Sequence, residues 1–503
     1  MPTERQPDAA DSFNAAFSPA GLRQAVRHGS RHTAIAQAAS HVASIVVLAS
    51  LYHLVAPRDF GLIGMALPVV MFLRIFTSLG LNIATVQSRT LSPALVSSLF
   101  WLHLALGTAI ALVTAALAPA VAWFFDEHDA LLVTLALGGT SIASALGLQH
   151  IALLERNLRL GGAALSRLAG QVAGGVVGIA LAFLGYGVWA LVAQQYVELV
   201  ALAVVAWGLE PWRPTRPRVG EPLRETLRFG GYFTAGQVVL HLLGSVDKIL
   251  VGVTLGTEAL GFYSQAFAIM MKPVIVLTTP LSSVMLPALS RSVHDRQSYG
   301  QIVLAFQRLL GVVSFPAGIG LALVAHDTML VLGGSKWDAA GPLLAALSAT
   351  ILVQGFINMA GSIFVSAGRW RAMLVGLLVM LVVLIAGLLA GYKLGRYYGQ
   401  PALGVAWGFS LTTCLALFLP YMLFCLRLVR VSPAAWARQL VRPAAAAVGM
   451  GAIVFAVRHG LAHLAWLPPA GLLAAEIATG VAAYTLFAWS DIRWCVNRLR
   501  RLD

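Results

Sequence analysis

Apolar runs recur along the whole chain, and each is close to the ~20 residues that an α-helix needs to cross the hydrocarbon core of a bilayer. Of the 503 residues, 59% are hydrophobic and only 11% are charged, whereas soluble proteins carry about 25% charged residues. Because lipid offers the backbone no hydrogen-bond partner, such runs form helices. The sequence therefore predicts an all-α polytopic membrane protein.

The runs predict about fourteen membrane helices. The expected spans are 33–55, 61–82, 94–118, 130–150, 163–184, 187–208, 230–254, 260–284, 301–325, 338–362, 371–391, 401–425, 443–458 and 469–489. The thirteenth is the shortest. Within the fifth of these spans, Gly174, Gly175 and Gly178 form a dense group, which predicts close helix packing.

A proline-rich segment divides the runs into two groups, since Pro211, Pro214, Pro217 and Pro222 prevent one continuous helix there. The expected organisation is a cytoplasmic N-terminal segment 1–32, a first lobe 33–208, a cytoplasmic linker 209–229, a second lobe 230–426, two further helices with their preceding loop at 427–490, and a basic cytoplasmic tail 491–503.

The two groups share an internal pattern. Arg27 and His41 accompany the first run, and Arg228 and His241 accompany the seventh, at offsets of 201 and 200 residues. Gly61 and Gly261 follow the respective runs at the same spacing. Six crossings separate the copies, so the repeat is parallel. We expect two six-helix lobes related by a pseudo-two-fold axis along the membrane normal, plus two C-terminal helices.

Basic residues are distributed unevenly between the loops. With the N-terminus in the cytoplasm, 24 arginines fall on the cytoplasmic side and 5 arginines and lysines fall on the other. This is the positive-inside pattern, and it predicts that both termini are cytoplasmic. The polar residues 1–32 are not followed by a short apolar region with a cleavage site, so a removed signal peptide is not expected.

Several functions are disfavoured by what the sequence lacks. The net charge of +14 lies in short loops without interleaved aromatics, so nucleic acid is not an expected partner. Cys414, Cys425 and Cys495 lack metal-ligand spacing. The acidic loop from Asp126 to Asp129 could bind a divalent cation, but without regular ligand spacing a solvated loop is the favoured interpretation. Phosphate-binding and hydrolase motifs are missing. We expect no catalytic residue, no metal and no cofactor.

Some charges lie inside the apolar runs, where they are expensive. Arg74 and Lys272 occupy similar depths in the second and eighth runs, each about a dozen residues after the matching glycines. They predict a water-filled cavity whose cations bind an anionic substrate. Structural ion pairs between the lobes are the alternative hypothesis.

Asp247, Lys248 and Glu198, together with His41 and His241, are candidates for ion pairing or for coupling to a H⁺ or Na⁺ gradient. Adjacent residues point about 100° apart on a helix, so Asp247 and Lys248 are not expected to pair with each other. We expect Lys272 to be the partner of Asp247, across the turn between the seventh and eighth runs. A lone histidine in such a run is more often a packing residue than a proton relay.

An ordered series of motifs spans roughly residues 20 to 430. It comprises Pro57-Arg58-Asp59-Phe60-Gly61, Leu79-Gly80-Leu81, Leu99-Phe100-Trp101, Gly185-Tyr186-Gly187-Val188-Trp189, Asp247-Lys248-Ile249-Leu250, Leu260-Gly261-Phe262-Tyr263 and Pro287-Ala288-Leu289-Ser290-Arg291. In this order the series resembles the Wzx-type oligosaccharide flippases of the multidrug/oligosaccharidyl-lipid/polysaccharide exporter superfamily. Many members carry an acid before the first Leu-Gly, where this chain has Thr77-Ser78.

The resemblance implies a transporter rather than an enzyme. It would flip undecaprenyl-pyrophosphate-linked oligosaccharide units across a bacterial inner membrane for exopolysaccharide, capsule or lipopolysaccharide O-antigen assembly, by alternating access of two lobes around a cationic cavity. The implied partners are the lipid-linked oligosaccharide, the lipid bilayer, a polysaccharide polymerase and a chain-length regulator.

Two alternatives stay open. A drug or cation antiporter of the same superfamily would favour an acidic, aromatic cavity, whereas the deep charges here lean positive. A membrane polysaccharide polymerase or ligase would present a sizeable outer loop with catalytic polar residues, and the sequence contains no such loop.

Overall fold

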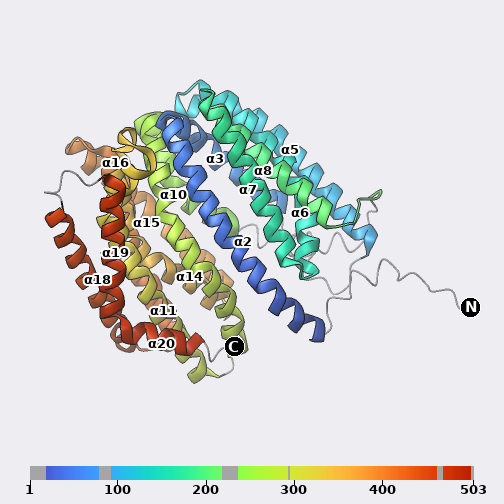
Figure 1. The fold of residues 1–503 in the computed structure, drawn as a ribbon. Coiled ribbons are helices and arrows are strands. Elements are labelled where there is room, and N and C mark those ends of the chain that lie inside the picture. The colour runs from blue at the N-terminus through green and yellow to red at the C-terminus, as the bar shows by residue number, and fades with distance from the viewer. Residues whose placement is uncertain are drawn as a thin grey trace, which may run out of the picture. The chain divides into compact units, whose positions relative to one another are not determined.

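The computed structural model describes residues 19–78, 92–217, 236–292, 295–366, 368–461 and 468–499, and every regular element in these ranges is a helix (Figure 1). The chain divides into two compact units, Met1–His241 and Leu242–Asp503. The expected linker beyond residue 217, the Arg228 copy of the repeat and the Leu79–Leu81 motif lie outside the described residues.

The first unit contains helices α2 (Pro19–Leu54), α3 (Pro57–Ser78), α5 (Pro93–Phe125), α6 (Asp129–Arg156), α7 (Leu160–Phe183) and α8 (Val188–Leu209). Neighbours in sequence form antiparallel pairs, α5 with α6 and α7 with α8. The sequence sets the ends of α5: Ser92 caps its first turn by accepting from Leu95 N, and Asp126 ends it in the left-handed region at φ 53°.

Glycines set the spacing of α7 against its neighbours. A Cβ on Gly170 would lie 2.5 Å from the Glu198 carbonyl oxygen of α8, and one on Gly174 would lie 2.6 Å from that of Gln194. Gly175, on another face of α7, meets Val47 of α2 at 2.3 Å in the same test. Small residues let helix backbones approach closely in a membrane. The expected close packing of this glycine group is confirmed.

The second unit begins with a helical hairpin. α10 (Val246–Arg291) is one element by its hydrogen bonds, but Gly256 inside it has φ 81° and ψ −172°, a conformation open essentially to glycine alone. The Tyr263 hydroxyl reaches Asp247 Oδ2 at 3.0 Å, although 16 residues of straight helix would separate them by about 24 Å. The chain therefore reverses at Gly256.

The remaining elements of this unit are mostly long helices. They are α11 (Arg296–Leu323), α12 (Ala325–Gly333), the 3₁₀ turn η2 (Ser335–Trp337), α13 (Ala340–Ser348), α14 (Ile351–Ser366), α15 (Trp370–Tyr397), α16 (Pro401–Leu411), the π-helical turn η3 (Thr412–Leu417), α17 (Phe418–Leu428), α18 (Pro433–Leu461), α19 (Pro469–Phe487) and α20 (Trp489–Leu499). α18 and α19 pair with each other and pack on α11 (Figure 1).

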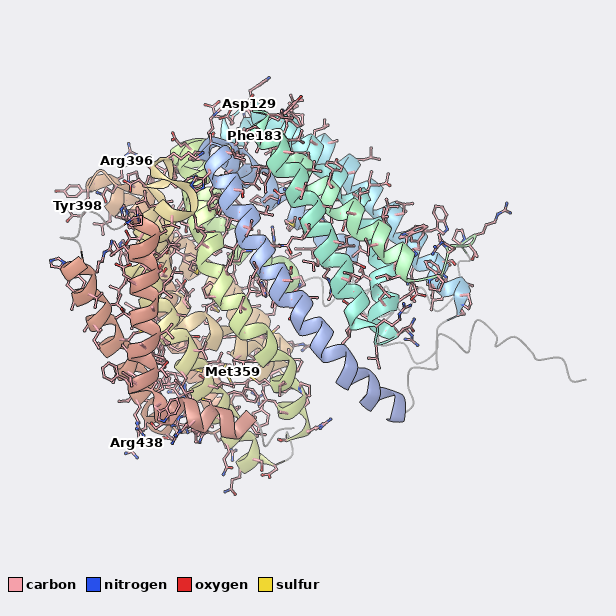
Figure 2. The ribbon with its side chains drawn as sticks, viewed as in Figure 1. Asp129, Phe183, Met359, Arg396, Tyr398 and Arg438 are labelled. Atoms are coloured by element: carbon pink, nitrogen blue, oxygen red, sulfur yellow. The ribbon has the colours of Figure 1, made fainter. Side chains whose placement is uncertain are left out.

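Within the described residues, 12 helices are long and apolar enough to cross a membrane, or 13 if α13 and α14, bent by 50°, form one span. The stretch Gly236–Val276 counts there as one span, and its reversal at Gly256 makes it two crossings. The resulting arrangement agrees with the expected multi-helix fold. In Figure 2, Arg396 and Tyr398 lie at one end of the second unit and Arg438 at the other, as for helices that present polar residues to the two membrane surfaces.

One expected boundary is wrong. The thirteenth helix, expected at 443–458, is α18 and extends over Pro433–Leu461. Pro443 lies inside it rather than at its start, because a transmembrane helix tolerates proline where neighbouring groups satisfy the freed carbonyl. The helix is therefore among the longer ones.

Candidate functional site

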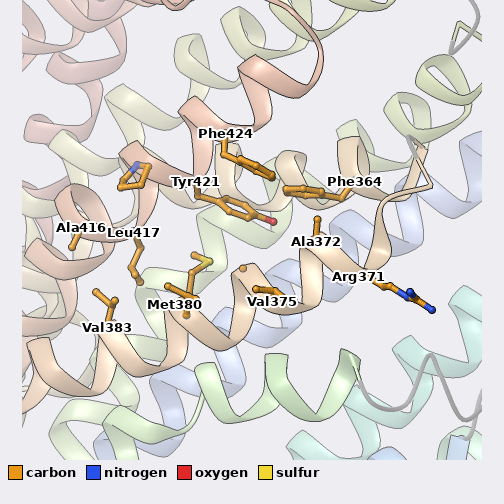
Figure 3. A pocket seen from close by; sticks show the side chains of 13 residues that line it. Phe364, Arg371, Ala372, Val375, Met380, Val383, Ala416, Leu417, Tyr421 and Phe424 are labelled. Atoms are coloured by element: carbon orange, nitrogen blue, oxygen red, sulfur yellow. The ribbon is translucent and has the colours of Figure 1, made fainter.

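An apolar cavity of about 480 Å³ lies in the second unit, among α14, α15, η3 and α17 (Figure 3). Its walls are carbon-rich side chains, principally Phe364, Val375, Val379, Met380, Val383, Leu417, Pro420, Tyr421 and Phe424. We call this cavity the α15–α17 groove. Its size falls in the range of small-molecule sites, ~300–1,000 Å³.

Aromatic rings form one wall of the groove. The ring of Phe364 on α14 lies 5.4 Å from that of Tyr421 and 5.8 Å from that of Phe424, both on α17. Figure 3 shows these three rings together on one side of the groove. Aromatic pairs at such distances attract one another, so the three rings form one continuous aromatic wall.

Helix packing explains why the groove opens beside the N-terminal half of α15. Towards its C-terminus, a Cβ on Gly391 would lie 2.4 Å from Gly404 O and one on Gly395 would lie 2.7 Å from Gly404 Cα, so α15 and α16 touch through backbone. The contact ends at Gly387, beside Thr412. Thr412 begins the π-helical turn η3, and such turns are frequent at functional sites. Beyond it, large side chains replace glycines and the groove lies between the helices.

The groove has a cation at one end. Arg371 stands in the first turn of α15, lines the groove and is exposed. Figure 3 shows its guanidinium extending beyond the apolar side chains. An apolar trough that ends at a guanidinium suits a molecule with an apolar chain and an anionic head, because arginine offers a planar fork to phosphate oxygens.

The two expected substrate cations occupy different units. Arg74 lies on α3, is half-buried, and donates from Nη2 to Ser144 Oγ of α6 at 2.7 Å. Lys272 lies on α10 and is exposed. Each is positioned within its own unit, and their shared role as lining of one central cavity stays a prediction.

The structure corrects the expected partners of Asp247. Its carboxylate is fully buried, accepts from the Tyr263 hydroxyl at 3.0 Å, and lies 3.6 Å from Lys248 Nζ. Lys272 lies nine residues beyond Tyr263, about 13 Å farther along the helix. The expected pair of Asp247 with Lys272 is therefore wrong, and so is the expectation that Asp247 and Lys248 do not meet.

Lys248 reaches its neighbour because its side chain is long. Its ammonium donates to Gly244 O at 2.6 Å and lies 3.8 Å from the centre of the Phe267 ring. A lysine stem can bend alongside the helix and carry its head towards an adjacent residue. The roles of Asp247 and Lys248 in coupling stay predictions.

The other candidates lie in the first unit. Glu198 is half-buried on α8, against Gly174 of α7. His41 is exposed on α2. His241 shares a hydrogen bond of 2.8 Å with Pro68 O, and its ring lies 6.1 Å from that of Phe72. The structure does not bring these three side chains into one cluster among the interactions it describes.

Sequence reasoning missed a buried charge cluster in the second unit. Arg458 Nη2 of α18 lies 2.9 Å from Asp327 Oδ2 of α12, and its Nε lies 3.8 Å from Glu476 Oε1 of α19. Glu476 is the one acid in the apolar run Pro469–Phe487, which is the signal that could have identified it. Asp327 lies 149 residues before Glu476 in the sequence, and no sequence pattern links residues so far apart.

Acidic residues around the start of α6 form ion pairs with an arginine. Arg58 Nη2 lies 3.0 Å from Glu127 Oε1 and 2.9 Å from Asp129 Oδ2. Both carboxylates are thus engaged by a guanidinium. Among the described residues, no group of three or more His, Cys, Asp or Glu side chains is arranged to hold a metal ion.

Comparison with known proteins gives the family. Residues 50–342 match a family model described as "Polysaccharide biosynthesis protein", which is more than half of the chain. The chain belongs to this family. The Wzx-type resemblance is thereby supported on independent grounds.

Individual proteins are similar over most of the chain. The teichuronic acid biosynthesis protein TuaB of Bacillus subtilis is 23% identical over 92% of this chain and 95% of its own length. The lipopolysaccharide biosynthesis protein WzxC of Escherichia coli is 22% identical over 69% of this chain and 71% of its own. The succinoglycan biosynthesis transport protein ExoT of Rhizobium meliloti is 29% identical over 60% of this chain and 61% of its own.

Solved structures show the fold. The lipid II flippase MurJ in an inward closed conformation superposes with a TM-score of 0.71, at 13% identity, over 92% of this chain and 99% of that one. An inward-facing multidrug transporter of the MATE family superposes with a TM-score of 0.62, at 15% identity, over 78% of this chain and 96% of that one. The chain shares the fold of these two proteins.

Proposed function

We propose that the protein flips lipid-linked oligosaccharide units, carried on a polyprenyl pyrophosphate, from the cytoplasmic to the periplasmic leaflet of a bacterial inner membrane. The observation that carries the proposal is the α15–α17 groove, an apolar trough that ends at Arg371 in a member of the polysaccharide biosynthesis family. Relatives whose names include "transport protein" and "flippase" support transport rather than catalysis.

The proposed substrate has an apolar isoprenoid tail and a charged pyrophosphate. The groove offers an apolar surface to the tail and a cation, Arg371, to the pyrophosphate. The isoprenoid tail would lie along Val375 and Val379 against the aromatic wall, where it leaves lipid for an equally apolar surface. The pyrophosphate would lie near Arg371. Arg74 and Lys272 are proposed to receive the pyrophosphate or acidic sugars deeper in the membrane.

Transport would follow from alternating access of the two units, in the manner proposed for transporters built from repeats. The chain carries no phosphate-binding loop for ATP, so we propose that a H⁺ or Na⁺ gradient supplies the driving force. A polysaccharide polymerase and a chain-length regulator would take the flipped unit onward.

Filling the groove tests this proposal. Val375→Trp places an indole in the groove, and Val382→Trp places the same side chain on the same helix at a position that is 67% exposed and does not line it. We expect Val375→Trp to reduce surface polysaccharide at least tenfold in a complemented flippase-deficient strain, while Val382→Trp retains most activity. Immunoblots of membranes control for protein level.

The outcomes separate the site from the function. Equal activity of the two well-expressed variants contradicts the groove as the tail site while leaving flipping intact. Failure of the wild-type protein to restore any surface polysaccharide, tested in flippase-deficient strains that make different repeat units, contradicts the function itself.

A further inference from the structure

Two buried acids share one arginine in the second unit. The carboxylates of Asp327 and Glu476 are 8% and 0% exposed, and both face the guanidinium of Arg458. If both acids were ionised, the cluster would carry one uncompensated negative charge in a low-dielectric region. Proteins usually avoid such a charge by letting one group neutralise.

Glu476 is the poorly satisfied member of the cluster. Neither of its two oxygens accepts a hydrogen bond within the described part of the chain, whereas only one oxygen of Asp327, Oδ2, is in that position. The contact of Glu476 with Arg458 Nε is also long, at 3.8 Å. Asp327 has the shorter contact, 2.9 Å to Nη2, and a third nitrogen of Arg458, Nη1, donates to Leu323 O. The guanidinium is thus committed mainly to Asp327 and to backbone.

We propose that Asp327, Arg458 and Glu476 form a proton-binding site in which Glu476 carries one exchangeable proton. Binding of the proton leaves Asp327 and Arg458 as a balanced pair. Release leaves the carboxylate of Glu476 buried beside them and weakens the attachment of α19 to α12. Arg458 is 32% exposed, so the cluster has a connection to the surroundings through which the proton can exchange.

The other titratable groups near α19 do not alter this charge count. On α12, His326 pairs with Asp338 at 3.3 Å, and on α18, His459 stacks on Phe455. At the far end of α19, Tyr484 donates to Val312 O of α11. On α20, Asp491 is bound by Arg308 of α11, Cys495 lies in the same core, and Arg493 packs over the Trp489 ring at 4.7 Å.

The pair formed by Arg308 and Asp491 provides a matched control. It joins α11 to α20 in the same unit, and the Asp491 side chain is 2% exposed, but here one acid has one arginine to itself. Arg308 also donates from Nε to Asp491 Oδ1 at 3.1 Å. Replacing either buried acid by its amide makes the same chemical change, while the charge left behind differs.

The first experiment compares the Tm of the purified full-length protein with that of Glu476→Gln and Asp491→Asn. We expect Glu476→Gln to keep or raise the Tm, since glutamine resembles the protonated acid and leaves a balanced pair. We expect Asp491→Asn to lower the Tm, since it leaves the half-buried Arg308 without its counter-charge. A fall in Tm for Glu476→Gln as large as that for Asp491→Asn would overturn the proposal.

The second experiment reads the proton itself. A glutamate in an unfolded chain gives up its proton near pH ~4.3, whereas the folded protein holds it to higher pH, so the wild-type Tm should fall as the pH rises from about 5 towards the pH at which folded Glu476 releases its proton. In Glu476→Gln that part of the fall should vanish, and Asp327→Asn should remove it too, because Glu476 then pairs alone with Arg458. If the Tm of the wild type and of both variants depended on pH in the same way, the proposal would be overturned. Asp327, Arg458 and Glu476 would then exchange no proton over this pH range. These readouts do not depend on which substrate the protein flips.

Discussion

At the scale of single residues, burial decides which polar contacts matter. Arg58 contacts Glu127 and Asp129, yet its side chain is 52% exposed, and exposed ion pairs contribute about 0–1 kcal/mol. Asp247 also has two contacts, with Tyr263 and Lys248, but it is fully buried. Loss of a partner there leaves a carboxylate that water cannot reach. The contacts of Asp247 are therefore the ones that hold the Gly256 hairpin together.

Tyr263→Phe tests this difference. It removes one hydroxyl, which donates to Asp247 at 3.0 Å, and hydrogen bonds to charged groups contribute about 1.5–3 kcal/mol. We expect a loss of that size in the free energy of unfolding, measured by denaturant unfolding in detergent. Tyr398→Phe, at a position 72% exposed, is the control and should be neutral. If the two variants are equally stable, the Asp247 contact contributes nothing.

At the scale of helices, glycine spacing determines where the chain packs tightly and where it opens. The α15–α16 contact is backbone against backbone at Gly391 and Gly404, whereas the same α15 lines the groove two to four turns earlier, at Val375 and Val383. The groove therefore depends on a contact that lies outside it. A change in the glycines should alter the groove without touching its walls.

The same substitution at two glycines should have opposite effects. Gly391→Ala adds a methyl group 2.4 Å from Gly404 O, and overpacking of this kind costs about 1–3 kcal/mol. Gly361→Ala in α14 meets nothing within 4 Å and should gain up to ~1 kcal/mol from helix propensity. Thermal unfolding of both variants checks the signs. A neutral Gly391→Ala would mean that the two helices can separate freely.

Most helices could be predicted from apolar length alone, because a membrane fixes that length. The expected spans 187–208 and 469–489 lie within about two residues of α8 and α19. The π-helical turn Thr412–Leu417 inside the expected span 401–425 could not be predicted, since its residues are as apolar as those of a regular helix. The start of α18 was missed because a proline signals a boundary in water more reliably than in lipid.

The candidate site was less accessible to sequence reasoning than the fold. Glu198 and Arg74 stand out as single charges in apolar runs, and such residues can be found without a structure. Which group each one meets depends on helix rotation and on turns such as Gly256, so the partner of Asp247 was not predictable. An apolar groove is still harder to find, because its lining has the same composition as the lipid-facing surface.

At the scale of the whole molecule, the distribution of charge sets the orientation. The 24-to-5 split of basic residues between the two sets of loops predicts that residues 209–229 face the cytoplasm and that the loop before α6 faces the periplasm. Two polar residues in these segments already have partners. Thr215 is hydrogen-bonded to Ser97, and Asp129 contacts Arg58, so neither is a suitable position for a probe.

Exposed positions without these contacts are better probes of orientation. We propose Pro217→Cys and His128→Cys, both at exposed residues, in a background with Cys414, Cys425 and Cys495 replaced. In intact cells whose outer membrane is permeabilised, a membrane-impermeant maleimide should label His128→Cys and should label Pro217→Cys only after the inner membrane is opened. The native Cys495 needs replacement although burial raises its pKa to about 11, because slow alkylation would still add background. Labelling of Pro217→Cys in closed cells, with His128→Cys protected, would invert the topology and place Arg371 on the periplasmic side, where it could not meet the pyrophosphate before the flip.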